Sequence, residues 1–336
     1  MKNTTADFTV LELCAGAGGQ ALGLERAGFA HTGLVELDPH CCNSLRANRP
    51  SWRVVQADLN KVEPTAFKGV DLIAGGLPCP PFSIAGRQLG ADDSRNLFPA
   101  ALRIISEIRP KAVLFENVKG LLASSFSEYR DSVSQELLSM GYIPEWRLLN
   151  ASDYGVSQLR PRAVMVAMRE DLYPFFGWPL SDGTAPPAVG EVLYDLMSAR
   201  GWNGADEWRA KANDIAPTIV GGSHKHGGPD LGPTRAKRAW TGLGVDGMGV
   251  ANEAPDPGFE GMPRLTVRMV ARLQGFPDDW VFTGGKTAQY RQVGNAFPPP
   301  VAKAVAVQIR RAFHECPVDH ETQKGLQLSL WPPKAS

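Results

Sequence analysis

The sequence lacks an excess of charge of either sign. Its 336 residues include 35 Lys and Arg and 35 Asp and Glu, so the formal net charge is zero. A balanced total can conceal a local basic face, so this composition neither indicates nor excludes a nucleic-acid partner. Cysteine is scarce as well, because five cysteines are too few, and odd in number, for the disulfide framework of a secreted domain. We therefore expect a protein of the reducing cytoplasm.

Long apolar segments and an N-terminal signal are also absent. The longest uncharged stretch near the N-terminus, residues 72–86, contains three prolines and cannot span a bilayer. The first eight residues show no basic flank followed by an apolar core. The chain shows no internal repeat, and it is long enough for one large domain and a smaller one, with no membrane association expected.

Strand-like and helix-like segments alternate through the first half of the chain. Runs of β-branched and large apolar residues predict strands at 8–13, 31–36, 52–56, 70–74, 112–115, 145–149 and 163–168. Helical spacing of apolar residues, with Gly or Pro near the ends, predicts helices at 19–27, 39–47, 96–108 and 127–140. This alternation predicts an α/β fold with a doubly wound, mostly parallel sheet.

The composition changes near residue 177. Residues 177–263 contain 16 of the 35 glycines and few periodic segments, which predicts a smaller, loop-rich second domain. A helical pattern returns after Leu265, and an apolar helix at 300–313 is expected to pack back on the sheet. The predicted divisions are therefore 1–180, 181–280 and 281–336, with residues 314–336 as a surface tail.

Several candidate ligand-binding residues stand where predicted strands end, which is where open parallel sheets bind ligands. A glycine-rich loop at 15–19 follows the first strand, and Glu36 and Asp58 end the second and third. An acid in the position of Glu36 can hold ribose hydroxyls, and Asp58 can receive an adenine amino group. A tight turn without a ligand is the plain alternative for the loop. Because the loop lacks the full phosphate-binding glycine pattern, S-adenosylmethionine fits it better than NAD.

Cys79 lies in a loop with three prolines after the fourth predicted strand, where no packing role for a thiol is evident. The other four cysteines are better explained as small hydrophobic residues. Neither a cysteine nor a histidine stands at ligand spacing from Cys79, so no metal site is expected. A nucleophile is the better interpretation, provided that a neighbouring group lowers its pKa.

Two further groups of polar residues accompany this cysteine. Glu116 follows the fifth predicted strand and is either a plain strand-end carboxylate or a general acid. Gln158, Arg160 and Arg162 are spaced by two residues, which places them on one face of an extended segment. Taken alone, this trio is better interpreted as a solvated basic strand than as the group that lowers the pKa of Cys79.

Six motifs occur along the chain in a recognisable order. They are Ala15-Gly16-Ala17-Gly18-Gly19, Pro78-Cys79-Pro80-Pro81-Phe82-Ser83, Glu116-Asn117-Val118, Gln158-x-Arg160-x-Arg162, Leu273-Gln274-Gly275-Phe276-Pro277 and Gln292-Val293-Gly294-Asn295. In these motifs, and over nearly its whole length, the chain resembles the C5-cytosine DNA methyltransferase family. The resemblance implies a Rossmann-like methyltransferase fold with S-adenosylmethionine as cofactor and S-adenosylhomocysteine as product.

For catalysis, the resemblance implies that Cys79 attacks C6 of a cytosine that has flipped out of the duplex, while Glu116 protonates N3. It also implies that Arg162 holds O2 of the base and that Arg160 steadies the catalytic loop and the thiolate. Methyl transfer to C5, loss of the C5 proton and elimination of Cys79 then release 5-methylcytosine.

The resemblance also implies a set of cofactor contacts. They are expected from Cys14, Ala15, Gly16, Gly18, Gly19, Glu36, Leu37, Asp58, Leu59, Pro78 and Asn295. The chain departs from the family at Cys14 and Leu37, where the family usually has aromatic residues near the adenine.

A target-recognition domain is implied between the arginine motif and the Leu-Gln-Gly-Phe-Pro motif. Residues 200–238 in this region carry seven Lys and Arg against four Asp and Glu. DNA contacts are expected from Ser83, Gln158, His224, Lys225, Arg235, Lys237 and Arg238. The last three are expected mainly at phosphates, although a solvated loop face explains any single one of these residues equally well.

The implied function is that of a bacterial, cytoplasmic, DNA-associated methyltransferase of a restriction-modification system. It is expected to be monomeric and to protect double-stranded DNA from a partner endonuclease without a stable complex. A dehydrogenase would leave the Pro-Cys-Pro loop unexplained, and methyltransferases that act on adenine N6 or cytosine N4 need no cysteine nucleophile. A transfer-RNA cytosine methyltransferase would share the core motifs. A catalytically idle DNA-binding module is opposed by the intact Cys79, Glu116 and arginine pair.

Overall fold

The computed structural model describes residues 8–78, 96–181, 183–221 and 229–315. Four predicted site residues, Cys79, Ser83, His224 and Lys225, and the predicted tail beyond Glu315 lie outside these described residues. Within them, no helix is long and apolar enough to cross a membrane.

The first of two lobes is built on a seven-stranded sheet with the strand order β3-β2-β1-β4-β5-β7-β6. The strands are β1 (Phe8–Leu13), β2 (Phe29–Glu36), β3 (Val54–Gln56), β4 (Leu72–Gly75), β5 (Ala112–Val118), β6 (Tyr142–Asn150) and β7 (Pro161–Arg169). The strands β1 to β5 are parallel, whereas β7 pairs antiparallel with both β5 and β6. The predicted doubly wound, mostly parallel α/β sheet is confirmed.

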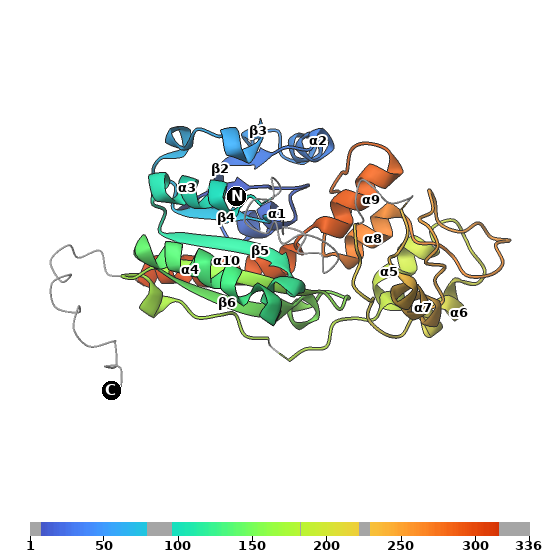
Figure 1. The fold of residues 1–336 in the computed structure, drawn as a ribbon. Helices are drawn as coiled ribbons and strands as arrows, with labels where there is room; N and C mark the ends of the chain where they lie inside the picture. Colours follow the sequence, from blue (N-terminus) through green and yellow to red (C-terminus); the bar gives the residue numbers. More distant parts are fainter. Residues whose placement is uncertain (1–7, 79–95, 182, 222–228, 316–336) are drawn as a thin grey trace, which may run out of the picture.

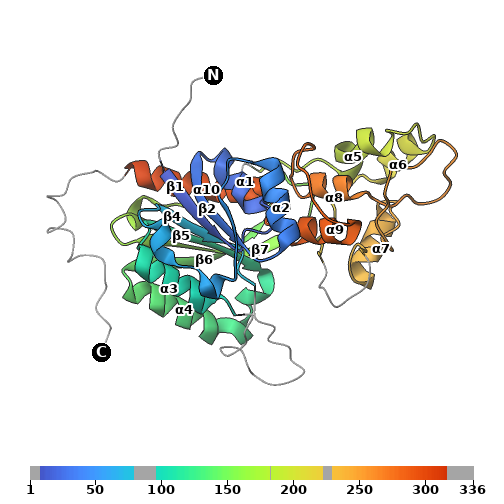
Figure 2. The same cartoon turned by 90° about the horizontal axis from the view of Figure 1, so that it is seen from above.

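Helices cover both faces of this sheet, as Figure 2 shows from above. The helices of this lobe are α1 (Gly19–Arg26), α2 (Pro39–Asn48), α3 (Phe98–Ile108), α4 (Ser127–Ser139) and α10 (Pro299–Glu315). Because side chains alternate along a strand, Leu11 and Leu13 pack with α3 and α4, while Val10 packs on the opposite face with α1 and α10. The predicted return of the last helix to the sheet is therefore confirmed.

The second lobe lies beside the first in Figure 1 and contains α5 (Val189–Met197), α6 (Ala205–Lys211), α7 (Thr234–Gly242), α8 (Val267–Leu273) and α9 (Lys286–Asn295). The glycine-rich region is thus more regular than its composition predicts, since it contains α5, α6 and α7. These helices are only seven to nine residues long. The core around α6 and α7 depends on single large side chains, Trp208 and Trp240, rather than on a long periodic stripe.

One hydrophobic core joins the two lobes. Leu22 of α1 and Cys41 of α2 belong to the same buried cluster as Trp240, Trp280 and Val293. The helix α9, which falls in the predicted C-terminal segment, packs with α8 in the second lobe, so only α10 returns to the sheet. The division at residues 180 and 280 stays a prediction.

Several predicted strand ends differ from the structure by one to three residues, among them one end each of β3 and β5. The strand β3 begins at Val54 rather than at residue 52. The strand β5 continues to Val118, so Glu116 lies within the strand instead of after it. The extension follows from the antiparallel ladder with β7, whose register pairs Glu116 with Val164 and Val118 with Arg162.

The contact between α1 and α10 leaves no room for a side chain at Gly23, and this gives a prediction about stability. An added Cβ at Gly23 would lie 2.5 Å from Cβ of Ala302 and 2.6 Å from the carbonyl oxygen of Pro299. We expect Gly23→Ala to lower the free energy of unfolding by about 1–3 kcal/mol, although alanine has the higher helix propensity. Urea denaturation measures the change.

Gly242→Ala at the end of α7 is the matched control, because an added Cβ there meets no atom within 4 Å. This variant should be neutral or slightly stabilising. Equal effects of the two substitutions would contradict the close contact between α1 and α10.

Candidate active site

The loop between β1 and α1 contains three glycines that meet different constraints. Gly16 has a φ of +55°, and an added Cβ there would meet no atom within 4 Å. An added Cβ on Gly18 would lie 2.8 Å from Cζ2 of Trp280, and one on Gly19 would lie 2.4 Å from the carbonyl oxygen of Phe297. Of these three glycines, Gly16 leaves space for a ligand, whereas Gly18 and Gly19 leave space for neighbouring protein.

Glu36, at the end of β2, is fixed beside this loop by backbone donors. Its Oε2 accepts a hydrogen bond from the amide of Gly16 at 2.7 Å, and its Oε1 accepts from the amides of Leu37 and Asp38, each at 2.8 Å. The neighbouring side chain of Leu37 is 64% exposed. An oriented carboxylate, an open glycine and an exposed apolar side chain together fit the ribose and adenine of a nucleoside.

Asp58 begins a short 3₁₀ turn, η1 (Leu59–Lys61), in which its Oδ1 accepts from the backbone and side-chain nitrogens of Asn60, each at 3.0 Å. The side chain of Leu59 is buried in the core formed with α3 and α4. A ligand contact from Leu59 therefore has to come from its backbone.

The described thiols are poorly suited to nucleophilic attack. Burial raises the pKa of Cys14 to about 12 and the pKa of Cys42 to about 11, and it raises the pKa of Cys41 as well. Since the thiolate is the nucleophile, these groups are inert near neutral pH. The prediction that Cys41 and Cys42 are packing residues is confirmed by their burial.

Glu116, the predicted general acid, is buried and paired with Arg162. Its Oε1 lies 2.7 Å from Nε of Arg162, and the two side chains are only 9% and 10% exposed. Burial raises the pKa of Glu116 above its ordinary value, although Arg162 and Arg160 act in the opposite direction. Glu116 therefore keeps a proton at higher pH than an exposed glutamate, which suits a general acid.

Asn117 connects Glu116 to the segment that leads to the predicted nucleophile. Its side-chain nitrogen donates to the carbonyl oxygen of Leu77 at 2.9 Å, and both residues are buried. Pro78, the next residue, is exposed. The chain thus enters the Cys79 segment from a fixed point next to Glu116.

The interpretation of the arginine motif as a solvated basic strand is wrong. Gln158 and Arg160 are both fully buried, and Arg162 is 9% exposed. The predicted DNA contact of Gln158 is also wrong, because its amide is surrounded by protein and bonds to Gln274 and to the backbone of Ile219. Alternation places these side chains on one face, and the second lobe covers that face.

A cleft of about 370 Å³ opens between the lobes beside Arg162. Its lining includes Lys119 from the first lobe, Thr218 and Gly221 from the second, and Asn295 at the end of α9. An added Cβ on Gly221 would lie 2.3 Å from Oδ1 of Asn295. Asn295, a predicted cofactor contact, therefore lies directly against Gly221.

Two backbone segments of the second lobe, at Gly221 and at the end of α9, also meet here without a side chain between them. An added Cβ on Gly294 would lie 2.4 Å from Cα of Gly221. This position therefore excludes every side chain, so the path of the chain at 221 depends on the end of α9.

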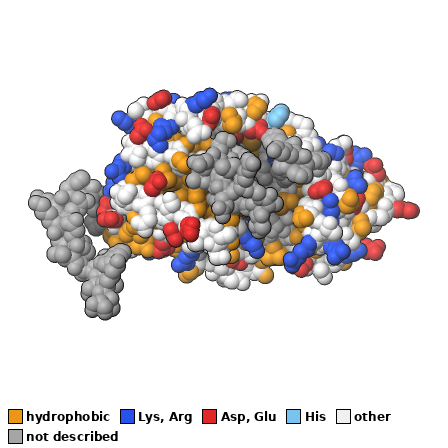
Figure 3. Space-filling view, viewed as in Figure 1, with side chains coloured by type: hydrophobic (Ala, Val, Ile, Leu, Met, Phe, Trp, Pro, Cys, Tyr) orange, Lys and Arg blue, Asp and Glu red, His pale blue; other side chains and the backbone are white. Residues whose placement is uncertain are grey.

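The basic residues predicted to contact DNA lie on α7. Arg235 and Arg238 are exposed, whereas Lys237 is partly buried and donates to Oδ2 of Asp230 at 2.7 Å. A spacing of three places Arg235 and Arg238 on neighbouring positions of one helix face. On the side seen in Figure 3, the second lobe carries Lys and Arg interspersed with Asp and Glu.

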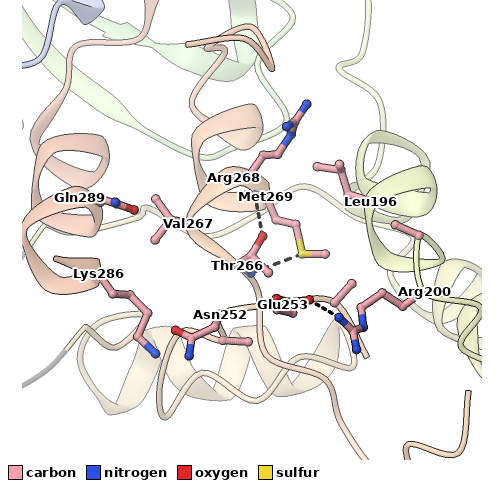
Figure 4. A pocket seen from close by; sticks show the side chains of 13 residues that line it. Leu196, Arg200, Asn252, Glu253, Thr266, Val267, Arg268, Met269, Lys286 and Gln289 are labelled. Carbon is pink, nitrogen blue, oxygen red and sulfur yellow. Dashed lines mark hydrogen bonds and ion pairs between the residues drawn. The ribbon is translucent and has the colours of Figure 1, made fainter. Parts of the chain in front are cut away.

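A larger pocket of about 600 Å³ lies within the second lobe, between α5, α8 and α9 (Figure 4). Arg200 forms an ion pair with Glu253 there, and Thr266 caps α8 by accepting from the amide of Met269 at 3.3 Å. This pocket contains none of the predicted site residues. In the part of the chain that the structure describes, no group of three His, Cys, Asp or Glu could hold a metal ion.

Sequence reasoning missed the role of Trp280. Its Nε1 donates to the carbonyl oxygen of Ala17 at 3.1 Å, and its ring fills the space that Gly18 leaves open. The two partners are 263 residues apart in the chain. The available signal was a large aromatic three residues after Leu-Gln-Gly-Phe-Pro, which by itself indicates only burial.

Comparison with known proteins now adds to this geometry. The model of the family described as C-5 cytosine-specific DNA methylase matches residues 8–311. The chain is similar to the type II methyltransferase M.NaeI of Lentzea aerocolonigenes, with 58% identity over 91% of this chain and 75% of that protein. It is also similar to the type II methyltransferase M.NgoMIV of Neisseria gonorrhoeae, with 52% identity over 91% of this chain and 98% of that protein.

Solved structures share the fold. A DNA modification methyltransferase encoded within an Escherichia coli prophage is 26% identical, with a TM-score of 0.66 over 92% of this chain and 100% of that chain. A Spodoptera frugiperda DNMT2 mutant is 19% identical, with a TM-score of 0.64 over 91% of this chain and 100% of that chain.

The bond between Trp280 and Ala17 predicts that the second lobe supports the cofactor loop. We expect Trp280→Phe to weaken S-adenosylmethionine binding by about 2- to 10-fold, because one buried hydrogen bond is lost beneath the glycines. Isothermal titration calorimetry without DNA measures this change.

Trp202→Phe is the matched control. Trp202 also donates from Nε1 to a backbone carbonyl, that of Phe259 at 2.9 Å, and it belongs to the same core. Its substitution should leave the cofactor affinity unchanged. A similar loss of affinity in both variants would show a general loss of stability instead.

Proposed function

Because the chain belongs to the C-5 cytosine-specific DNA methylase family, and is a DNA (cytosine-5)-methyltransferase of the restriction-modification type, we propose that Cys79, Glu116 and Arg162 carry its chemistry. The observation that supports this assignment is the buried pair of Glu116 and Arg162 beside the cleft between the lobes. Asn117 adds to it by binding the backbone two residues before Cys79.

The chemical difficulty is that C5 of cytosine is a poor nucleophile. In our proposal, the thiolate of Cys79 forms a bond to C6. The electron pair of the C5–C6 double bond then forms a C4–C5 double bond, and negative charge develops on N3. Glu116, in its neutral form, gives its proton to N3 and so takes up the charge that develops there. Arg162 holds O2 of the base while its guanidinium keeps the carboxyl group of Glu116 in place.

When bound, S-adenosylmethionine supplies an electrophilic methyl group to the activated C5 and leaves as S-adenosylhomocysteine. A base then removes the C5 proton, and the bond between C6 and Cys79 breaks to restore the C5–C6 double bond and the thiolate. The proton on N3 returns to Glu116, so neutral 5-methylcytosine is released and the acid is regenerated. The target base has to leave the stacked duplex for these contacts, which costs a few kcal/mol that protein contacts offset.

The family and fold imply the use of S-adenosylmethionine. We propose that the ribose hydroxyls bind Glu36 and that the adenine lies near Leu37 and Asp58, with Gly16 leaving space for the ligand. The oriented carboxylate of Glu36 and the exposure of Leu37 support this arrangement. In this arrangement the exposed side chain of Leu37 takes the place of the aromatic residue that the family usually has near the adenine.

Target selection is assigned in this proposal to residues 177–263, with double-stranded DNA as the partner of α7. The exposed guanidinium groups of Arg235 and Arg238 support the assignment. A monomeric, cytoplasmic enzyme in a bacterium, paired with an endonuclease that forms no stable complex with it, completes the proposal.

The covalent mechanism predicts a sharp difference between cysteines. We expect Cys79→Ser to abolish methylation while S-adenosylmethionine binding survives, since the serine hydroxyl is a far weaker nucleophile. Wild type should be trapped irreversibly on DNA containing 5-fluorocytosine, because fluorine cannot leave as a proton does. Bisulfite sequencing and denaturing gels of the trapped complex measure the two results.

Cys42→Ser is the control for this experiment, because Cys42 is buried and its Sγ lies 3.5 Å from the carbonyl oxygen of Glu36. It should retain methylation and trapping. In Glu116→Gln, both should slow by about 10²- to 10⁴-fold, as expected for the loss of a general acid. Normal turnover by Cys79→Ser would exclude the mechanism.

The assignment of α7 to DNA predicts two distinguishable outcomes for Arg235→Ala and Arg238→Ala. Loss of a phosphate contact should weaken binding to all DNA about equally and lower the salt slope by about 1. Loss of a guanine contact should cost about 1–3 kcal/mol on the proper site and relax one base position. Binding at several salt concentrations, together with methylation-sensitive sequencing, separates these outcomes.

Lys237→Ala is the comparison variant, because Lys237 is bonded to Asp230 and should change DNA binding less. Cofactor affinity without DNA should stay unchanged in all three variants. If Arg235→Ala and Arg238→Ala lose cofactor binding, or match wild type on every DNA, α7 does not contact DNA.

A further inference from the structure

A buried polar cluster at the junction of the lobes has no place in the chemistry proposed above. It consists of the side chains of Gln158, Arg160 and Gln274, which are all 0% exposed. We refer to these three residues as the interlobe latch. Buried polar groups are costly unless each finds a partner, so the partners of this cluster indicate what it does.

Gln158 joins two segments of the second lobe. Its Nε2 donates to Oε1 of Gln274 at 2.7 Å and to the carbonyl oxygen of Leu273 at 3.2 Å. Its Oε1 accepts from the amide of Ile219 at 2.8 Å. Gln274 in turn donates from Nε2 to the carbonyl oxygen of Val293 at 2.8 Å.

The side chain of Arg160 donates its hydrogen bonds to backbone carbonyl groups. Its Nη1 donates to the carbonyl oxygen of Ile219 at 2.5 Å, and its Nη2 donates to those of Gly294 and Ala296 at 2.7 and 2.8 Å. Across the described ranges, no carboxylate forms an ion pair with it. A guanidinium with rigid, divergent donors can bind three carbonyl groups at once, which a lysine ammonium on a flexible stem cannot reproduce in this geometry.

Backbone contacts extend the same junction. Leu159 donates from its amide to the carbonyl oxygen of Ala216 at 2.7 Å, and the amide of Ala216 donates to the carbonyl oxygen of Ser157 at 3.0 Å. Residues 216–219 therefore lie along the segment that continues into Arg162. The latch binds this pair of segments to the end of α9, which carries Asn295, and to the start of the link between α9 and α10.

From these contacts we infer that Gln158 and Arg160 are positioning residues that set the place of the recognition segment relative to Glu116 and Arg162. The end of the segment at 216–219 lines the cleft itself, through Thr218 and Ile219, and continues along it to Gly221. A shift of Ile219 would therefore move the wall of the cleft relative to Glu116 and Arg162. In this way recognition of the correct sequence is coupled to the geometry of the catalytic groups.

This inference rests on the proposal that residues 177–263 choose the DNA site. It adds to the predicted role of Arg160 in steadying the catalytic loop and the Cys79 thiolate, which stays a prediction because Cys79 lies outside the described residues. The guanidinium of Arg160 donates to the carbonyl oxygens of Ile219, Gly294 and Ala296, and the side chain has no exposed surface.

The test uses the full-length enzyme and the target sequence that bisulfite sequencing identifies. Gln158→Glu keeps the shape of the side chain but cannot donate to Gln274 and Leu273. Arg160→Lys keeps the charge but not the three carbonyl contacts. For each variant, kcat/KM is measured on the target duplex and on a duplex with one altered base pair.

We expect kcat/KM on the target duplex to fall by about 3- to 30-fold in both variants, and the preference over the altered duplex to fall with it. The affinity for S-adenosylmethionine without DNA should stay within about twofold of wild type, as expected if the latch acts on a site other than the cofactor pocket.

Gln292→Glu is the matched control, because Gln292 is another buried glutamine whose amide binds Ser44, Thr283 and Ala288, away from the recognition segment. Gln292→Glu should lower the melting temperature about as much as Gln158→Glu does, yet keep the preference for the target duplex. If Gln158→Glu does not fold, Gln274→Glu removes a donor at the other end of the same network and is measured in the same way.

If Gln158→Glu and Arg160→Lys keep the preference for the target duplex, or if Gln292→Glu loses it equally, this inference is wrong. The proposed function is not affected by that result. If substitutions throughout residues 177–263 leave the preference of the enzyme intact, the proposed division of labour fails, and the inference fails with it.

Discussion

The antiparallel register between β5 and β7 is the constraint on which the site depends. It pairs Glu116 with Val164 and Val118 with Arg162, so Glu116 and Arg162 are diagonal neighbours on one face of the sheet. A slip of one residue would carry Arg162 to the opposite face. Removal of either charge would leave the other buried without its partner, which typically costs about 3–5 kcal/mol. The ion pair and the register therefore stabilise each other.

The second lobe packs against the proposed cofactor loop as well as lining the cleft. Trp280 closes the space beneath Gly18 and binds the carbonyl oxygen of Ala17, and Phe297 lies against Gly19. The two lobes share one hydrophobic core, in addition to the buried polar contacts of the interlobe latch. Such a core resists independent movement of the lobes, since sliding would expose large aromatic side chains. The cofactor loop and the recognition region are therefore parts of one packed unit.

Much of this arrangement follows from local patterns in the sequence. Alternating strands and helices predict the parallel part of the sheet, because the spacing of apolar residues and the positions of Gly and Pro are local properties of the sequence. The antiparallel direction of β7 is not predictable in this way, since parallel and antiparallel strands share the same side-chain period. The extension of β5 through Glu116 depends on that pairing and was missed for the same reason.

Burial of the arginine motif illustrates a second limit. A spacing of two residues places Gln158, Arg160 and Arg162 on one face, but it cannot say what covers that face. The partners of Gln158 and Arg160 at Ile219 and Gly294 lie 61 and 134 residues along the chain. Short helices such as α6, which bury one tryptophan, likewise leave little periodic signal in a glycine-rich region. Long-range packing decides these features, and it becomes visible only when the chain is folded.

The direct backbone contact between Gly221 and Gly294 has a consequence for how such an enzyme acquires a new target sequence. Gly221 occupies the space that a Cβ on Gly294 would need, and a Cβ on Gly221 would in turn meet Oδ1 of Asn295 and the carbonyl oxygen of Arg291, so a side chain at either position requires a change in the other segment. In the proposed division of labour, a recognition region transplanted from another enzyme must therefore keep glycine at 221, or bring its own end of α9. Modular exchange of specificity is possible in this architecture, but the seam between the exchanged piece and the scaffold runs through two residues that are 73 positions apart in the chain.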